Sequence, residues 1–168
     1  MYYACPRTIW VISHGVVWHN AYMTEQPQAR VGVGILVIKD GKALWGLRKG
    51  SFGAGLWGGA GGHLEYGETM ETAILRELDE EAGIKVKNLR ILCVSDFLTH
   101  YPKHYVDIGF VADWDSGDPE VREPDKLERW EWRELDDIPE NSFAPMRGYI
   151  EAYKTGKNIF TYSAEDAV

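Results

Sequence analysis

Three glutamates gather near the end of one predicted helix. In the stretch RELDEEAG (residues 76–83), Glu77, Glu80 and Glu81 are spaced i, i+3 and i+4, so they share one face of a helix. Like charges at these spacings repel by roughly 0.2–0.5 kcal/mol per pair, and acidic groups near a helix C-terminus also oppose the helix dipole. One interpretation is a solvated acidic face. The other is a divalent cation with oxygen ligands, which would compensate the clustered charge.

The helix that carries these glutamates is predicted over residues 69–82. Thr69 is a suitable N-cap, and Gly83 stands where a left-handed C-cap belongs. Ala73, one turn before Glu77, is small and is expected to leave room on the acidic face. An apolar stripe at helical spacing has four members: Ile74, Leu75, Leu78 and Ala82.

The elements that must position this helix are predicted as a mixed sheet with two helices against it, an α/β or α+β layered domain. A glycine-rich loop at 50–62 precedes the acidic helix, and a charged loop covers 117–126. The second helix is predicted over 145–156 and is stopped by Gly156. Strands are predicted at 31–39 and 42–48, joined by an Asp-Gly turn, and at 88–100, 104–114 and 129–135.

Length and charge limit the class of protein. The chain of 168 residues suits one domain with a full core, and 45% apolar and 26% charged residues are ordinary for a globular protein. A formal net charge of −8 argues against a protein that binds nucleic-acid polymers, which usually carries basic patches. Such a protein can still bind a polyphosphate if metal ions neutralise the phosphates locally.

Residues 1–28 are interpreted as an extension outside the core domain, which then covers 29–168. The apolar run near the start is broken by Ser13, His14 and Gly15 and is too short to span a membrane. It also lacks the basic start and the cleavage site of a signal peptide. Cys5 and Cys93 match no metal or redox spacing, so a reducing, cytoplasmic location is expected.

The segment around the acidic helix fits a known signature. Residues 61–84 read GGHLEYGETMETAILRELDEEAGI. This resembles the Nudix hydrolase family, whose signature is Gly, five residues, Glu, seven residues, and then Arg-Glu-apolar-x-Glu-Glu-x-Gly-apolar. Every specified position is met, by Gly62, Glu68, Arg76, Glu77, Leu78, Glu80, Glu81, Gly83 and Ile84. The likeness covers residues 29–156 and points to the MutT-like, nucleotide-pool-cleaning branch, from which Ala60 departs because that branch often has proline there.

The resemblance implies a fold and a metal site. The expected fold is an α/β/α sandwich with a mixed sheet, in which the signature forms a loop, a helix and a loop. The expected ligands of Mg²⁺, with Mn²⁺ as a substitute, are the carbonyl of Gly61 and the side chains of Glu77, Glu80 and Glu81. Glu77 is the first choice for the general base, and Glu80 and Arg76 are the other expected catalytic residues. Arg76 and Glu68 are expected to pair with each other or with the ligating glutamates, and so to hold the ligands in place.

Further site residues are weaker expectations. The family often supplies another carboxylate from the strand after the charged loop, and either Glu128 or Glu131 could be that group. Arg48 is a candidate for the terminal phosphates, but it could equally be an exposed basic residue. His63 could contact phosphate or cap the loop. Phe143 and Met146 precede and begin the last helix, where relatives tend to place groups that contact the base.

The leading functional hypothesis is a Mg²⁺-dependent pyrophosphohydrolase. Its substrate would be a nucleoside triphosphate, including an oxidised or otherwise modified deoxynucleotide, and its products a monophosphate and diphosphate. One alternative is hydrolysis of another diphosphate, such as an ADP-sugar or a dinucleoside polyphosphate, and another is a non-catalytic nucleotide-binding regulator. A small nucleotide is the expected partner, with no nucleic-acid polymer and no membrane, and the resemblance also suggests a homodimer.

Two other patterns are interpreted as decoys. GAGLWG at 53–58 matches the GxGxxG dinucleotide fingerprint, but no helix opens directly on its glycines, as that fingerprint requires. His100 and His104 flank Pro102 without a carboxylate partner in register, so a surface turn is expected there instead of a metal site.

Overall fold

A computed structural model describes residues 28–50, 53–100 and 103–163 of the chain. Apart from its last residue, the extension predicted at 1–28 lies outside the described residues. Within the described part, none of the helices is long and apolar enough to cross a membrane.

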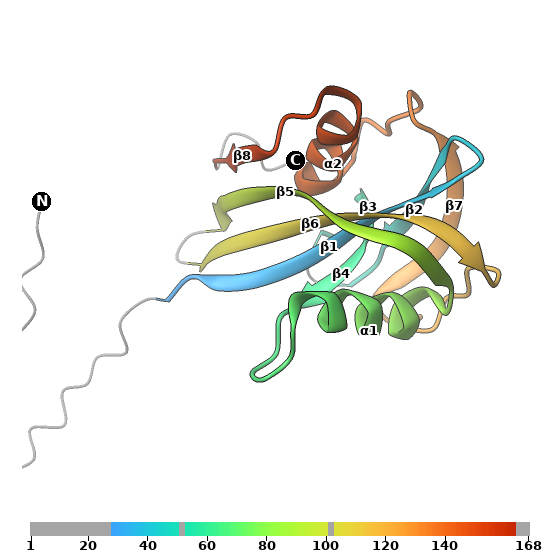
Figure 1. The fold of residues 1–168 in the computed structure, drawn as a ribbon, viewed down its shortest axis with the longest axis horizontal. Coiled ribbons are helices and arrows are strands. Elements are labelled where there is room, and N and C mark those ends of the chain that lie inside the picture. Colours follow the sequence, from blue (N-terminus) through green and yellow to red (C-terminus); the bar gives the residue numbers. More distant parts are fainter. Residues whose placement is uncertain (1–27, 51–52, 101–102, 164–168) are drawn as a thin grey trace, which may run out of the picture.

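Eight strands form one mixed sheet between two helices (Figure 1). The strand order is β3-β2-β1-β6-β5-β8, while β4 pairs with β1 and β7 pairs with β2. The β1–β6 and β5–β8 pairs are parallel, and the other named pairs are antiparallel. The strands are β1 (Arg30–Lys39), β2 (Lys42–Arg48), β3 (Trp57–Gly58), β4 (Ala60–His63), β5 (Lys85–His100), β6 (Lys103–Ser116), β7 (Leu127–Glu134) and β8 (Ile159–Tyr162).

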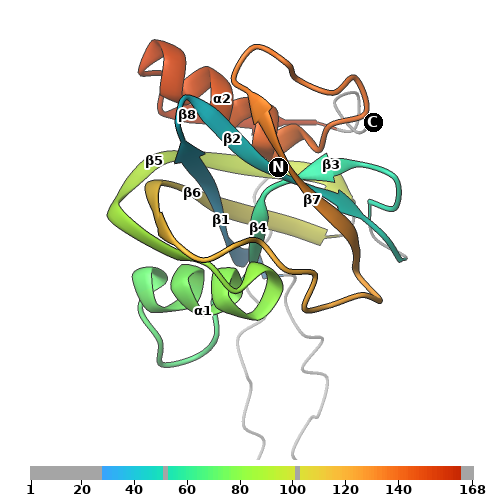
Figure 2. The same ribbon diagram turned by 90° about the vertical axis from the view of Figure 1, so that its right-hand side faces the viewer.

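Helices α1 (Met70–Ala82) and α2 (Ala144–Thr155) lie on opposite faces of the sheet, as the expected α/β/α sandwich requires. Figure 2 shows the same arrangement from the side, with β4 leading towards α1 and β7 running beside β2. Both helices end at a left-handed glycine, Gly83 with φ 68° and Gly156 with φ 77°. Both ends agree with the sequence prediction.

The alternation of β1 divides the core into two layers. Val33, Ile35 and Val37 pack with the buried side of α1, whereas Leu36 packs with α2 residues such as Ile150. Because successive side chains of a strand point to opposite faces, one apolar strand serves both helices.

The apolar stripe predicted for α1 is wrong in one member. Leu75 is 44% exposed, whereas Ala73 is fully buried beside Ile74. The buried face therefore runs through 73, 74, 78 and 82, and Ala73 fills the core instead of leaving room on the acidic face. The other three members of the predicted stripe, Ile74, Leu78 and Ala82, are buried as expected.

The glycine-rich segment is not only a loop, since it contains β3 and β4. A Cβ atom on Gly61 would lie 2.3 Å from the carbonyl oxygen of Val33, so only glycine can pair this closely with β1. Glycine runs carry no apolar alternation, which is why these strands were not predicted. Strand β8 is a further strand that the sequence analysis missed.

Candidate active site

The loop before α1 is shaped by local hydrogen bonds. The Oγ1 atom of Thr69 accepts a hydrogen bond from the backbone N–H of Thr72 at 3.1 Å, which confirms the predicted N-cap. The backbone N–H of Glu65 donates to the carboxylate of Glu68 at 2.8 Å. Glu68 is thereby turned towards the helix that follows.

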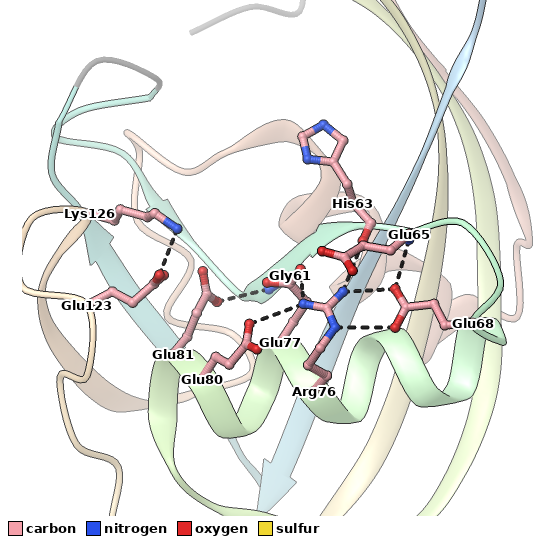
Figure 3. Close-up of polar contacts among 10 residues, drawn as sticks. All are labelled: Gly61, His63, Glu65, Glu68, Arg76, Glu77, Glu80, Glu81, Glu123 and Lys126. Atoms are coloured by element: carbon pink, nitrogen blue, oxygen red, sulfur yellow. Dashed lines mark hydrogen bonds and ion pairs between the residues drawn. The ribbon is translucent and has the colours of Figure 1, made fainter.

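Arg76 is the centre of a charged network (Figure 3). Its guanidinium donates two hydrogen bonds to Glu68, at 2.9 and 3.2 Å, and single hydrogen bonds to Glu77 at 2.9 Å and Glu80 at 3.1 Å. It also donates to the carbonyl of His63 at 3.3 Å. The bond from Arg76 lowers the pKa of Glu68, and the bonds to Glu68 and Glu77 raise the pKa of Arg76. The predicted pairing of Arg76 with Glu68 and the acidic cluster is therefore confirmed.

Glu81 points away from this network, into a cavity. Its Oε2 atom accepts a hydrogen bond from the backbone N–H of Gly61 at 3.0 Å. Burial raises the pKa of Glu81 to about 7, although the Gly61 bond and the charge of Arg48 act in the opposite direction. Burial also lowers the pKa of Arg48, which lies with its guanidinium carbon 5.4 Å from the ring centre of Phe143.

Glu77 occupies a space that exists only because position 62 is glycine. A Cβ atom on Gly62 would lie 2.2 Å from Oε1 of Glu77. The carboxylate of Glu77 therefore sits directly against the backbone of β4. A backbone carbonyl and a carboxylate brought this close are suitable neighbours for a cation.

The three glutamates do not converge on one point. Within the described ranges, no group of three or more His, Cys, Asp or Glu side chains is gathered closely enough to hold a metal ion. Glu80 is 53% exposed on its side chain and is held by Arg76, whereas Glu77 and Glu81 line the cavity. The donor set nevertheless fits Mg²⁺ in kind, because all its atoms are oxygens. To join the other two glutamates, Glu80 would have to leave Arg76.

The C-terminus of α1 is neutralised from outside the helix. The last turn contains no basic residue, but Arg122 in the 117–126 loop donates to the carbonyl of Asp79 at 2.9 Å and pairs with its carboxylate at 3.1 Å. The backbone N–H of Glu120 donates to the carbonyl of Ala82 at 2.9 Å. The indole N–H of Trp130 donates to Glu81 O at 3.3 Å. The loop thus satisfies carbonyls that a helix end leaves free.

One cavity of about 510 Å³ joins the acidic helix to the opposite side of the sheet. It is lined by the charged side chains of Glu77, Glu81, Arg48 and Lys126, and also by aromatic residues together with Asp107. Its volume is in the range of small-molecule sites. The aromatic and apolar lining includes Phe97, Tyr105, Phe143, Met146 and Tyr149.

Most of the predicted site residues line this cavity, namely Arg48, Gly61, His63, Glu77, Glu81, Phe143 and Met146. The ring of His63 lies 5.6 Å from that of Tyr105. Arg76, Glu68 and Glu80 form the network beside the cavity and do not line it.

The two candidates for an extra carboxylate lie elsewhere. Glu128 and Glu131 both pair with Arg129, and Glu131 also pairs with Arg133. The bond from Arg129 lowers the pKa of Glu131. Neither glutamate lines the cavity.

Sequence reasoning missed several residues of the cavity lining, three of which matter for its chemistry. Lys126 lines the cavity and bonds Glu123 at 2.7 Å, while Glu123 itself raises the pKa of Glu81. Asp107 and Tyr149 also line the cavity. A usable signal existed for Asp107, since it is the one charged residue in the otherwise apolar and aromatic run YVDIGFVA.

Comparisons with known proteins agree with this geometry. Residues 28–153 match the NUDIX domain family. The chain is 39% identical over 106 residues to an oxidized purine nucleoside triphosphate hydrolase of Danio rerio, covering 62% of this chain and 66% of that protein. It is 35% identical over 116 residues to the Mus musculus protein of the same description, covering 68% and 72% respectively.

Comparison with solved structures also finds NUDIX proteins. The crystal structure of a MutT NUDIX hydrolase from Burkholderia pseudomallei superimposes with a TM-score of 0.71 at 37% identity, covering 74% of this chain and 98% of that one. A NUDIX hydrolase from Nitrosomonas europaea shares the fold with a TM-score of 0.68 at 23% identity, covering 79% and 93%. The chain therefore belongs to the Nudix family, and the protein is a MutT-like Nudix hydrolase.

Proposed function

We propose that the protein is a Mg²⁺-dependent pyrophosphohydrolase that cleaves a nucleoside triphosphate to the monophosphate and diphosphate. The observation that carries the proposal is a cavity whose lining combines two kinds of group. Glutamates and two cations, Arg48 and Lys126, line it together with aromatic rings. The charged groups suit a phosphate chain and the aromatic rings suit a flat base.

The relatives support the same class of substrate. Two of them, at 39% and 35% identity, are described as oxidized purine nucleoside triphosphate hydrolases. We extend to this chain the part of that description that its cavity supports, namely a nucleoside triphosphate. The net charge of −8 favours a small nucleotide over a nucleic-acid polymer.

In the proposed mechanism, Glu77, Glu80, Glu81 and the carbonyl of Gly61 would hold Mg²⁺, which would neutralise phosphate charge and acidify a bound water. Glu77 accepts the proton of the attacking water as the new P–O bond forms and the phosphoanhydride bond breaks. Arg76 keeps the Glu77 carboxylate oriented through its 2.9 Å hydrogen bond. Arg48 and Lys126 stabilise the negative charge of the phosphate chain.

The proposal is tested by measuring hydrolysis products from a panel of nucleoside triphosphates, an ADP-sugar and a dinucleoside polyphosphate, with Mg²⁺ and with chelator. The products are monophosphate and diphosphate from a triphosphate, AMP and a sugar phosphate from the ADP-sugar, and two mononucleotides from the dinucleoside polyphosphate. We expect triphosphates to be the best substrates and chelator to abolish turnover. Glu81→Gln, which keeps the shape of the side chain, should lower kcat/KM by about 100-fold or more, because removing even an indirect metal partner costs roughly 10- to 100-fold.

The matched control is Glu134→Gln, since Glu134 is exposed and pairs with Lys42 at 3.3 Å away from the cavity. This variant should turn over substrate at the wild-type rate. Release that persists in chelator, or a Glu81→Gln variant as active as the control, would reject the metal mechanism. Separate Glu128→Gln and Glu131→Gln variants test the two remaining carboxylate candidates.

A further inference from the structure

Asp107 lines the cavity and lies beside Gly32 of a neighbouring strand. It stands in strand β6, in register with Gly32 of the parallel strand β1, and a Cβ atom on Gly32 would lie 3.6 Å from Oδ1 of Asp107. A side chain larger than hydrogen at position 32 would therefore narrow the space beside this carboxylate.

Tyr149 of α2 fixes the carboxylate of Asp107. Its hydroxyl donates a hydrogen bond to Oδ2 of Asp107 at 2.6 Å. The ring of Tyr149 fits against Gly34 and Gly109, which are paired in register: Cβ atoms there would lie 2.3 and 2.5 Å from Tyr149 atoms. Burial and the charge of Asp107 raise the pKa of Tyr149, so its hydroxyl stays protonated and keeps donating.

The second oxygen of Asp107 is free to bind a ligand. Oδ1 takes part in no hydrogen bond or ion pair among the described residues. It is also not sealed in the core: the partnerless buried side-chain atoms in the described part of the chain belong to Trp45, Ser95, Ser142 and Tyr162. Oδ1 therefore opens onto the cavity that Asp107 lines. A carboxylate in such surroundings is stabilised by N–H donors and repels carbonyl oxygens.

We propose that Asp107 is a specificity-determining residue that accepts hydrogen bonds from the amide N–H and the neighbouring amino group of a guanine-type base, with Tyr149 as its positioning residue. The inference rests on the proposed function, because it places the base against Asp107 and the aromatic rings and the phosphates against the metal-binding glutamates. Of the common bases, guanine presents two adjacent donors on one edge, which match the two oxygens of a carboxylate. Oδ1 is free, and Oδ2 keeps a second lone pair beside the one that accepts from Tyr149. Thymine and uracil present a single N–H between two carbonyls, and Asp107 disfavours them.

Burial raises the pKa of Asp107 to about 6, although the hydrogen bond from Tyr149 lowers it. At pH 7.5 the side chain is still mostly an ionised acceptor. The ring of Phe97 packs edge-on to that of Phe143, with centroids 5.4 Å apart, and both rings line the same cavity as Asp107. A base held by its edge at Asp107 would thus also meet aromatic surface.

The test compares dGTP with dITP, which differ only in the 2-amino group, and with dTTP. Wild-type kcat/KM should favour dGTP over dITP by about 10-fold or more, because a well-made bidentate pair discriminates by about 1–3 kcal/mol, or 5- to 150-fold. Asp107→Asn turns one acceptor into a donor and should bring the dGTP to dITP ratio close to one. The effect should lie mainly in KM with kcat nearly kept, since base contacts bind ground state and transition state alike.

Tyr149→Phe keeps the ring in its glycine seat and removes only the hydroxyl. It should lower the dGTP to dITP ratio less than Asp107→Asn does. A purely structural role for either residue would reduce both substrates equally and leave the ratio unchanged, which would overturn the proposal. If Asp107→Asn fails to fold, Tyr149→Phe and the wild-type ratio still decide the outcome.

Binding of the monophosphates GMP, IMP and TMP, measured by calorimetry in chelator, adds a readout that needs no turnover. We expect the wild type to bind GMP most tightly and TMP most weakly. A protein that hydrolyses triphosphates but treats GMP and IMP alike refutes the role of Asp107 only. A protein that hydrolyses no triphosphate yet binds GMP selectively refutes the proposed function and leaves the role of Asp107 in place.

Discussion

The carboxylate of Glu77 lies where position 62 has no side chain. The contact is so close that a Cβ atom there would lie 2.2 Å from Oε1 of Glu77. On the other side, Arg76 holds the same carboxylate by a hydrogen bond of 2.9 Å. Glu77 is thus confined between a backbone and a guanidinium, as the roles in metal binding and proton transfer that we propose for it require.

We predict that Gly62→Ala inactivates the enzyme without unfolding it. The added methyl displaces the Glu77 carboxylate, and a misplacement near 1 Å can cost roughly 100-fold in rate. Steady-state kinetics and a thermal melt of the variant measure the two effects. Gly58→Ala is the matched control, since its Cβ would meet its nearest atoms at an ordinary 3.6 Å, and both activity and melting temperature should be nearly kept. A Gly62→Ala enzyme with normal turnover would contradict this account of Glu77.

At the scale of elements, the 117–126 loop explains how α1 tolerates acidic groups at its C-terminus. Arg122 supplies the positive charge that the last turn lacks, and it lies against the left-handed cap at Gly83. A cation near a helix C-terminus stabilises it by about 0.3–1 kcal/mol at an exposed site. The loop therefore compensates part of the charge repulsion without any metal.

The two glycine caps offer a matched prediction of stability. Gly83→Ala and Gly156→Ala both force alanine into a left-handed conformation, at a cost of about 1–2 kcal/mol. At Gly83 the new Cβ would also lie 2.4 Å from the guanidinium of Arg122, whereas at Gly156 it would meet nothing within 4 Å. Urea unfolding should show Gly83→Ala as the more destabilised variant by about 0.5–1 kcal/mol.

The extra destabilisation by Gly83→Ala over Gly156→Ala should vanish when both variants are made in an Arg122→Ala background. The contact of Arg122 with the end of α1, which the new methyl group displaces, is then already absent. If Gly83→Ala and Gly156→Ala lowered the free energy of unfolding equally in the wild-type background, Arg122 would not stabilise the end of α1.

At the scale of the whole molecule, Asp107 links the cavity to global stability. Burial raises its pKa from 3.8 to about 6, so the folded state binds this proton more tightly than the unfolded chain does. The stability that comes from protonating Asp107 is fully present below about pH 4 and is lost as the pH rises through 6. Two pKa units correspond to about 3 kcal/mol, an upper figure for a buried group.

Urea unfolding of wild type and Asp107→Asn in chelator, from pH 4.5 to 7.5, tests this linkage. The free energy of unfolding of the wild type should fall relative to the variant by up to about 2 kcal/mol over that range, since part of the full effect lies below pH 4.5. Carboxylates with a lowered pKa, such as Glu68 and Glu131, make the free energy of unfolding rise with pH. They are present in both proteins, so their contribution cancels when the wild type is compared with the variant. A difference that is constant with pH would mean that Asp107 does not titrate as described.

Homodimer formation and a cytoplasmic location stay predictions.

The sequence alone determined the parts of the site that depend on local spacing. The acidic helix, its cap at Thr69, the left-handed Gly83 and the pairing of Arg76 with Glu68 all lie within 15 residues of one another, where helical periodicity and short-range hydrogen bonds decide the geometry. The same local reasoning placed the apolar stripe of α1 one residue off at Leu75, because only packing against the sheet sets the rotation of a helix.

Tertiary structure alone decided the cavity. Asp107 and Tyr149 are 42 residues apart, and Arg122 and Asp79 are 43 apart. Each pair meets because the sheet and its loops bring distant segments together, and no periodicity in the chain records such a meeting. The glycines of β1, β4 and β6 make these approaches close enough to matter, since each leaves out the one atom that would block a carboxylate, a ring or a backbone.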